Sequence, residues 1–129
     1  MDEDLKNSGG TGYGLVAYTE KTDGTTLSLL DDAMIEVVEW IEATSGFFLG
    51  HVKMAVAMPE KTMTLNLTDL KRGVEHHNGP MPLGVRADIR FMSAVVDVNR
   101  VELAEVMKKT FIKNGFKIKD DRKRIVEFR

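Results

Sequence analysis

The sequence predicts an α+β fold, a two-layer sandwich in which two helices cover one face of an antiparallel or mixed sheet of four to six strands. Two segments, starting near residues 28 and 99, repeat apolar residues at helical spacing. Several shorter runs alternate apolar and polar residues, which is typical of strands with one buried face. The order of these elements indicates a variant of the ferredoxin-like plan.

The chain of 129 residues suits one domain. Residues 1–10 are polar and end in glycine, so we expect a flexible leader there and place the domain at residues 11–129. Residues 11–20 alternate apolar and polar side chains, which predicts the first strand. A turn at residues 21–24 follows.

The first helix is strongly amphipathic. Ser28 and Asp31 have the spacing of a capping box at its start, although Asp31 replaces the usual glutamate. Gly46 can adopt the left-handed conformation that commonly closes a helix, so the helix should end there.

Two alternating runs, residues 48–58 and 62–68, are separated by a short turn, and we therefore expect a hairpin. In the first run, His51 and Lys53 fall on the polar face of the strand. Asn66 falls on the polar face of the second run. These side chains would face water on the side of the sheet away from the helices.

A third alternating run, residues 85–91, carries Arg86, Asp88 and Arg90 on its polar face. The three runs together would then share one outer polar surface. At residues 93–96 the alternation stops at two adjacent valines, which indicates either a bulge or a strand end buried on both faces.

The second helix should begin at Asn99, with Glu102 as its capping partner three residues later. Asn114 and Gly115 are typical of a helix end. The chain finishes with residues that predict a strand or a hairpin around a charged turn.

The outer polar surface is the preferred candidate site. Arginine and lysine side chains there could bind a carboxylate or phosphate group, while Asn66 and His51 supply hydrogen bonds. We therefore predict a non-catalytic small binding or accessory domain that binds a partner protein or a small anionic ligand, with a homodimer across this face as one form of it. The candidate residues are His51, Lys53, Asn66, Arg86, Asp88 and Arg90.

The loop at residues 71–84 predicts a different function. It concentrates histidines and a glutamate, which together with a histidine from a nearby strand could bind Zn²⁺ or Ni²⁺. The alternative function is therefore a small metal-binding protein or a metal-dependent enzyme. An exposed loop with incidental histidines explains the same pattern. The candidate metal ligands are His51, Glu75, His76 and His77.

Composition excludes several other classes of function. Cysteine is absent, which excludes disulfides, thiolate catalysis and cysteine-ligated zinc. No apolar run approaches the length of a membrane span, about 18–20 residues, so we expect no association with a membrane. The acidic start is unlike a secretory signal, so we expect a cytoplasmic protein. The overall pI near 5.9 argues against a dedicated nucleic-acid binder, although residues 100–129 are net basic and could attract a polyanion.

Motifs of catalysis are also missing from the sequence. The glycine-rich residues 9–14 match neither phosphate-binding fingerprint, and no serine has the context of a nucleophile elbow. The sequence therefore favours a binding role over an enzymatic one.

An acidic helix followed by Gly50-His51-Val52-Lys53 resembles the C-terminal accessory domain of some CobW-like GTPases, in which a comparable strand follows a helix. The resemblance covers roughly residues 27–116, and only these four residues are motif-like. It implies an accessory domain linked to metal or cobalamin metabolism, with His51 and Lys53 on a surface that contacts a partner. The Walker-type GTPase domain and the cysteine metal motif of that family do not occur in this sequence, so the resemblance does not imply nucleotide hydrolysis.

Overall fold

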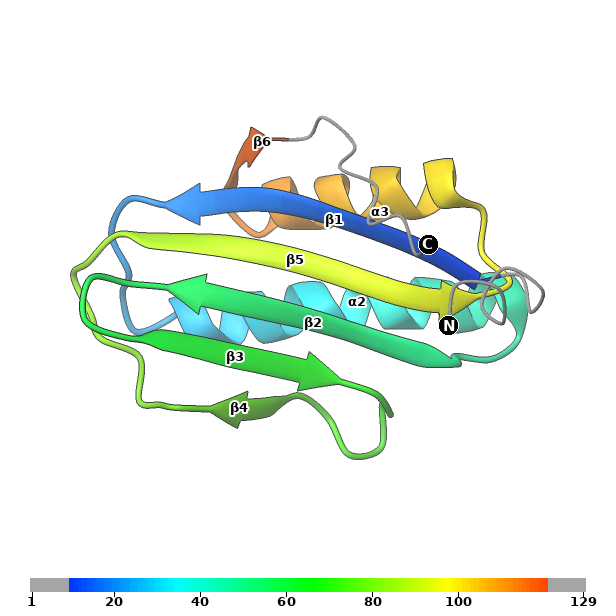
Figure 1. The fold of residues 1–129 in the computed structure, drawn as a ribbon, viewed down its shortest axis with the longest axis horizontal. Helices are drawn as coiled ribbons and strands as arrows, with labels where there is room; N and C mark the ends of the chain where they lie inside the picture. The colour runs from blue at the N-terminus through cyan, green and yellow to red at the C-terminus, as the bar shows by residue number, and fades with distance from the viewer. Residues whose placement is uncertain (1–9, 121–129) are drawn as a thin grey trace.

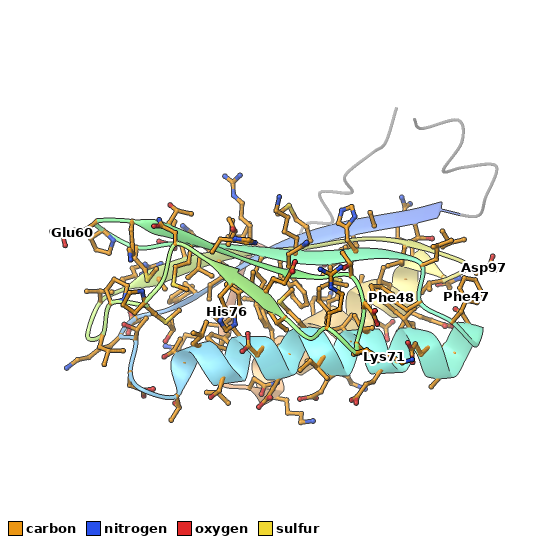
Figure 2. The ribbon with its side chains drawn as sticks, turned by 90° about the horizontal axis from the view of Figure 1, so that it is seen from below. Phe47, Phe48, Glu60, Lys71, His76 and Asp97 are labelled. Atoms are coloured by element: carbon orange, nitrogen blue, oxygen red, sulfur yellow. The ribbon has the colours of Figure 1, made fainter. Side chains whose placement is uncertain are left out.

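The structure, a computed structural model, describes residues 10–120 as a six-stranded antiparallel sheet with two helices on one face (Figure 1, Figure 2). The predicted α+β two-layer sandwich is therefore confirmed. The elements in chain order are β1 (Gly10–Thr19), α2 (Thr26–Ser45), β2 (Gly50–Ala57), β3 (Thr62–Leu67), β4 (Glu75–His77), β5 (Ala87–Val96), α3 (Arg100–Lys113) and β6 (Lys117–Asp120).

The predicted leader lies outside the described residues except for Gly10, which begins β1. The part of the predicted C-terminal strand or hairpin beyond Asp120 also lies outside them. Neither helix within residues 10–120 is both long and apolar enough to cross a membrane.

The strand order β4-β3-β2-β5-β1-β6 contains two interlocked units. Strands β1 and β2, joined by α2, both run antiparallel to β5 and are therefore parallel to each other, with β5 between them. Strands β5 and β6, joined by α3, flank β1 in the same way. This is the split βαβ arrangement of the ferredoxin-like plan, so we interpret the fold as that plan with β3 and β4 added beside β2.

The core lies between the sheet and the helices. Alternate residues of β1, β2, β3 and β5 turn toward α2 and α3, as the sequence predicted, and the apolar stripe of α2 packs on them. Each fully buried aliphatic or aromatic side chain stabilises the fold by about 1.5–3 kcal/mol. The largest fully buried side chains include Tyr13, Leu15, Leu30, Met34, Ile41, Met54, Met63, Leu65, Leu67, Ile89, Phe91 and Phe111.

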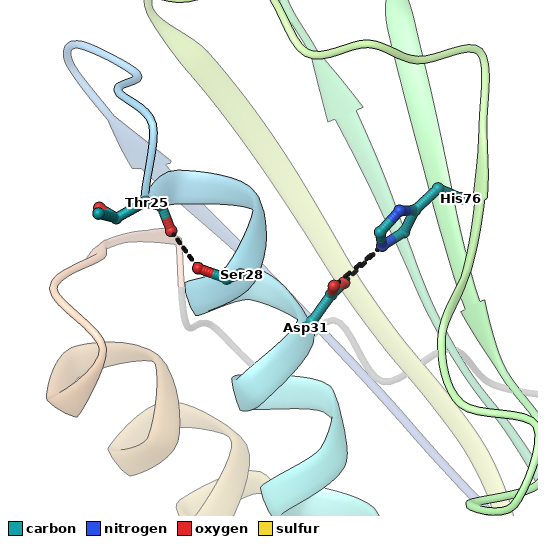
Figure 3. A network of polar contacts seen from close by, with 4 residues as sticks. All are labelled: Thr25, Ser28, Asp31 and His76. Carbon is teal, nitrogen blue, oxygen red and sulfur yellow. Dashed lines mark hydrogen bonds and ion pairs between the residues drawn. The ribbon is translucent and has the colours of Figure 1, made fainter.

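The predicted capping box at the start of α2 is wrong. The helix begins at Thr26, and the Asp23 carboxylate accepts hydrogen bonds from the backbone N–H and the hydroxyl of Thr25 at 2.8 and 2.6 Å. The Ser28 hydroxyl donates to the Thr25 carbonyl instead of capping a later N–H group (Figure 3). The Asp31 carboxylate is instead hydrogen-bonded to His76 on β4.

The other predicted helix boundaries are confirmed. Gly46 adopts the left-handed conformation at φ 85°, and its N–H group donates to the Glu42 carbonyl at 2.8 Å. Asn99 caps α3 by accepting a hydrogen bond from the Glu102 backbone N–H at 3.1 Å. Helix α3 ends before Asn114.

Strand β5 is longer than the sequence predicted. Its register against β1 and β2 continues without interruption, so of the two explanations for residues 93–96 the bulge is wrong and a strand end covered on both faces remains. Val95 is buried in the core and Val96 is half-buried on the opposite face, which explains the two adjacent valines. The short strand β4 was missed, because it lies in the stretch predicted as a loop.

Candidate binding face

The outer face of the sheet is the side turned away from α2 and α3 (Figure 2). Lys53 lies in the middle of β2, directly opposite Asn66 on β3 and Met92 on β5. Cross-strand partners point to the same side of a sheet. Because Val52 and Met54 are buried in the core, Lys53 and both of its partners face outward.

Arg90 is a second cation beside Lys53. It lies two residues before Met92 on β5 and is therefore the diagonal neighbour of Lys53, about 7–8 Å away. Both side chains are exposed. Within residues 10–120, neither side chain makes an ion pair or a hydrogen bond. The outer face thus holds two neighbouring positive charges without a carboxylate partner in the described part of the chain.

Two carboxylates on the outer face are already paired with other cations. Asp88 accepts a hydrogen bond from Arg86 at 3.2 Å and lies 3.7 Å from the Lys119 ammonium. The hydrogen bond from Arg86 is the main reason why the pKa of the Asp88 carboxyl is below its usual value. Glu75 on β4 lies 3.6 Å from Arg72. Neither carboxylate is therefore free to neutralise Lys53 or Arg90.

The structure separates Arg86 and Arg90, the two arginines of the predicted anion-binding surface. Arg90 follows Arg86 by four residue steps of extended chain, which corresponds to about 13 Å. The Arg86 guanidinium pairs with Asp88 and lies 4.3 Å from the centre of the Tyr18 ring. Arg86 and Asp88 thus form a pair of their own, and Arg90 is combined with Lys53 instead.

Two polar groups lie next to these cations. His51 is exposed, two residues before Lys53 on the same strand, and Asn66 is half-buried opposite Lys53. We call Lys53, Arg90, His51 and Asn66 the cationic cluster. Four of the six predicted binding residues therefore come together on β2, β3 and β5.

The residues predicted as metal ligands are not brought together in one site. Glu75 and His77 face outward on β4, whereas His76 between them points to the other side of the sheet, toward α2 (Figure 2). His51 lies on β2, two strands away. Among residues 10–120, no group of three or more histidine, aspartate or glutamate side chains is arranged to hold a metal ion.

His76 instead forms a pair with Asp31 that the sequence analysis missed. The Nε2 atom of His76 lies 2.8 and 3.0 Å from the two carboxylate oxygens of Asp31 (Figure 3). The pair ties the edge strand β4 to α2 across 45 residues of sequence. No local pattern connects residues this far apart.

Burial raises the pKa of the Asp31 carboxyl, and the hydrogen bond with His76 opposes that rise. The pKa of Asp31 is therefore raised overall relative to its unfolded-state value, so the folded state is more stable when Asp31 is protonated. This contribution to stability is present below the unfolded-state pKa of Asp31 and is lost as pH rises through its folded-state pKa.

We expect His76→Ala to raise the pKa of Asp31 further. Burial of Asp31 by the rest of the protein remains in this variant, while the hydrogen bond and the charge that lower its pKa are removed. A pH titration of the Asp31 carboxyl carbon by NMR measures the change. His77→Ala is the matched control, because His77 faces away from Asp31 and should leave its titration unchanged. An Asp31 pKa that falls or stays constant in His76→Ala would mean that the pair does not act as described.

The outer face is not polar along its whole length, which differs from the surface that the sequence predicted. Beyond Arg90, the outward residues of β5 are Met92, Ala94 and Val96, and all three are half-buried. The difference arises because β5 continues past the alternating run that was recognised in the sequence.

Comparison of the chain with protein-family models, with curated proteins and with solved structures found no match. The resemblance to the accessory domain of CobW-like GTPases therefore stays a prediction.

Proposed function

We propose that this protein is a non-catalytic binding domain whose cationic cluster holds an anionic group, either of a partner protein or of a small ligand. The observation that carries the proposal is the adjacency of Lys53 and Arg90, two exposed cations without an ion pair among residues 10–120. Two exposed like charges at this diagonal separation repel each other, although less than charges directly opposite each other would. A bound anion between the two side chains would remove this repulsion.

The chemistry of the cluster suits a carboxylate or a phosphate group. The planar guanidinium of Arg90 can donate two parallel hydrogen bonds to such a group, and the Lys53 ammonium can approach it as a point charge. Asn66 lies next to Lys53 and can donate a further hydrogen bond through its amide. Because the cations are exposed, salt should weaken the binding.

The proposal includes the accessory role that the resemblance to CobW-like GTPases implies, with the outer face as the surface that contacts a partner. It also includes a cytoplasmic location, which rests on the composition of the chain. Both parts depend on the sequence alone.

We expect the double variant Lys53→Ala/Arg90→Ala to lose anion binding by about tenfold or more, since a charge-assisted hydrogen bond contributes about 1.5–3 kcal/mol. Titration of inorganic phosphate and citrate into the labelled protein at low salt, followed by NMR, measures binding through the backbone amides around Lys53 and Arg90. Arg100→Ala/Lys109→Ala is the matched control, because it removes the same two charges from exposed positions of α3.

The control variant should bind both anions as the wild type does. Equal losses in the two double variants would show that only net charge matters, and the proposal would be wrong. It would also be wrong if neither anion gave saturable shifts on the outer face of the wild-type protein.

A further inference from the structure

A row of carboxylates runs along the side of α2 that faces away from the sheet. Asp32, Glu36 and Glu39 share one face of the helix, opposite its buried residues, and we call them the acidic stripe. Asp32 and Glu39 are exposed, and within residues 10–120 neither side chain makes an ion pair or a hydrogen bond. Glu36 pairs with Lys113 of α3 at 2.6 Å. Two carboxylates of the stripe therefore have no cation partner in the described part of the chain.

The outer face of the sheet and the outward side of α2 carry opposite charges. The cationic cluster and the acidic stripe lie on opposite sides of the two-layer sandwich (Figure 2). Lys53 and Arg90 therefore cannot pair with the carboxylates of the stripe in the same chain. The same groups can meet when two chains contact each other, because complementary charges on two surfaces favour their association.

A contact at the edge of the sheet fixes where the acidic stripe begins along the strands. His76, which pairs with Asp31, lies opposite Leu65 on β3. Leu65 in turn lies opposite Met54, the residue after Lys53 on β2. The stripe begins directly after Asp31. Its first carboxylate is therefore at the same level along the strands as Lys53, although on the other side of the sheet.

The acidic stripe then extends along the cationic cluster. At the far end of α2, the Ser45 hydroxyl donates to the Asp97 carbonyl just beyond β5 at 2.8 Å, so the helix runs along the strands. Seven residue steps of helix, about 10 Å, separate Asp32 from Glu39. Three residue steps of a strand cover about the same length, so Glu39 is at about the level of His51. The stripe and the cluster thus match in length and in position.

We propose that the anionic group held by the cationic cluster is the acidic stripe of a second copy of this chain. Helix α2 packs beneath β2 and β3 of its own sheet (Figure 1). Moving one copy perpendicular to its sheet, without rotation, therefore brings its Asp32 toward Lys53 and Arg90 of the other copy. The same movement brings Glu39 toward His51. The inference rests on the proposed function, because it identifies the partner protein.

The proposed contact is head-to-tail and differs from a homodimer across the outer face. A face-to-face dimer would bring two cationic clusters together, and like charges across an interface disfavour association. A head-to-tail contact uses two different surfaces, so each copy keeps one of them free and further copies can add. It joins the ends of long, exposed side chains and needs no groove. Exposed ion pairs contribute little individually and are screened by salt, so we expect weak association that strengthens at low salt.

The test reverses the charge of each surface separately. Lys53→Glu/Arg90→Glu makes the outer face acidic, and Asp32→Lys/Glu39→Lys makes the stripe basic. Each variant alone should associate at least about tenfold more weakly than the wild type. An equimolar mixture of the two should regain association, because the reversed surfaces are complementary to each other. Sedimentation velocity of the full chain at low salt and up to about 1 mM protein measures association in this range of affinity.

Glu60→Lys/Glu105→Lys is the matched control, because it makes the same change of net charge at exposed positions outside the acidic stripe. It should associate as the wild type does. Thermal unfolding verifies that each variant is folded. Asp32→Asn/Glu39→Gln replaces the lysine variant if the latter does not fold, and it should lose association as well.

The inference would be wrong if the wild type stayed monomeric at low salt, if the mixture did not regain association, or if the control lost association equally. Association of Asp32→Lys/Glu39→Lys alone would indicate a face-to-face dimer and would also overturn it. In each case, phosphate binding that still depends on Lys53 and Arg90 would leave the proposed function intact. A wild type that neither associates nor binds phosphate or citrate would contradict the inference and the proposed function together.

Discussion

Gly50→Ala is expected to destabilise the protein by about 3 kcal/mol or more. Gly50 begins β2 with φ 132°, a conformation that residues with a side chain rarely adopt. An added Cβ atom would also overlap the Ala94 carbonyl oxygen and lie 2.9 Å from the Val95 Cα. Both neighbours are backbone atoms of the central strand β5, so relief requires β2 and β5 to move apart.

Two other glycines allow the backbone strain at Gly50 to be measured separately from the steric overlap with β5. Gly46 has φ 85° but open space around its Cα, so Gly46→Ala should show conformational strain alone, about 1 kcal/mol. Gly24 has neither the strain nor a close neighbour, and Gly24→Ala should change stability by less than about 0.5 kcal/mol. Urea unfolding of the three variants measures the series. If Gly50→Ala were no worse than Gly46→Ala, the close approach of β2 and β5 would not exist as described.

The elements with strong local signals could be predicted from the sequence. The long apolar stripe before Gly46 and the cap formed by Asn99 with Glu102 defined both helices. Alternation along β2 and β3 was sufficient to place Lys53 and Asn66 on one face. These signals work because each depends on residues a few positions apart, where backbone geometry fixes which side chains share a side.

The features that depend on distant residues could not be predicted. Strand β4 has only three residues, all exposed, so it has no apolar alternation to reveal it. The neighbour relation of Lys53 and Arg90 requires the register of β2 against β5, which no turn connects directly. Asp31 was interpreted as a cap because its partner, His76, lies 45 residues away.

The start of α2 shows a limit of a different kind. The sequence pattern of Ser28 with Asp31 predicts a capping box, but the helix begins two residues before Ser28, at Thr26. In the structure Thr25 occupies the N-cap position without a side-chain cap, and Thr26 is the first helical residue, buried at 5 % exposure. A residue spacing that matches a cap is therefore not sufficient to fix the first residue of this helix.

Phe111→Ala is expected to destabilise the protein by about 3–5 kcal/mol. Phe111 is fully buried on α3, with its ring centre 4.8 Å from that of Phe91 on β5 and 5.1 Å from that of Phe116. Aromatic pairs at this separation contribute about 0.5–1.5 kcal/mol beyond the burial of their surface. Truncation removes both contacts and leaves a cavity between α3 and the sheet, which the surrounding backbone can fill only in part.

The neighbouring Ile112 provides the matched control for this variant. It is 61 % exposed on the same helix turn, so Ile112→Ala should change the free energy of unfolding by less than about 0.5 kcal/mol. Chemical unfolding of both variants measures the difference, and Phe111→Leu, with a smaller expected loss, serves if Phe111→Ala is too unstable to purify. Domains of this size have only about 5–15 kcal/mol of stability, so the loss at Phe111 is a large share of it. Similar values for the two alanine variants would contradict the placement of α3 against β5, and with it the assignment of the inner and outer faces of the sheet.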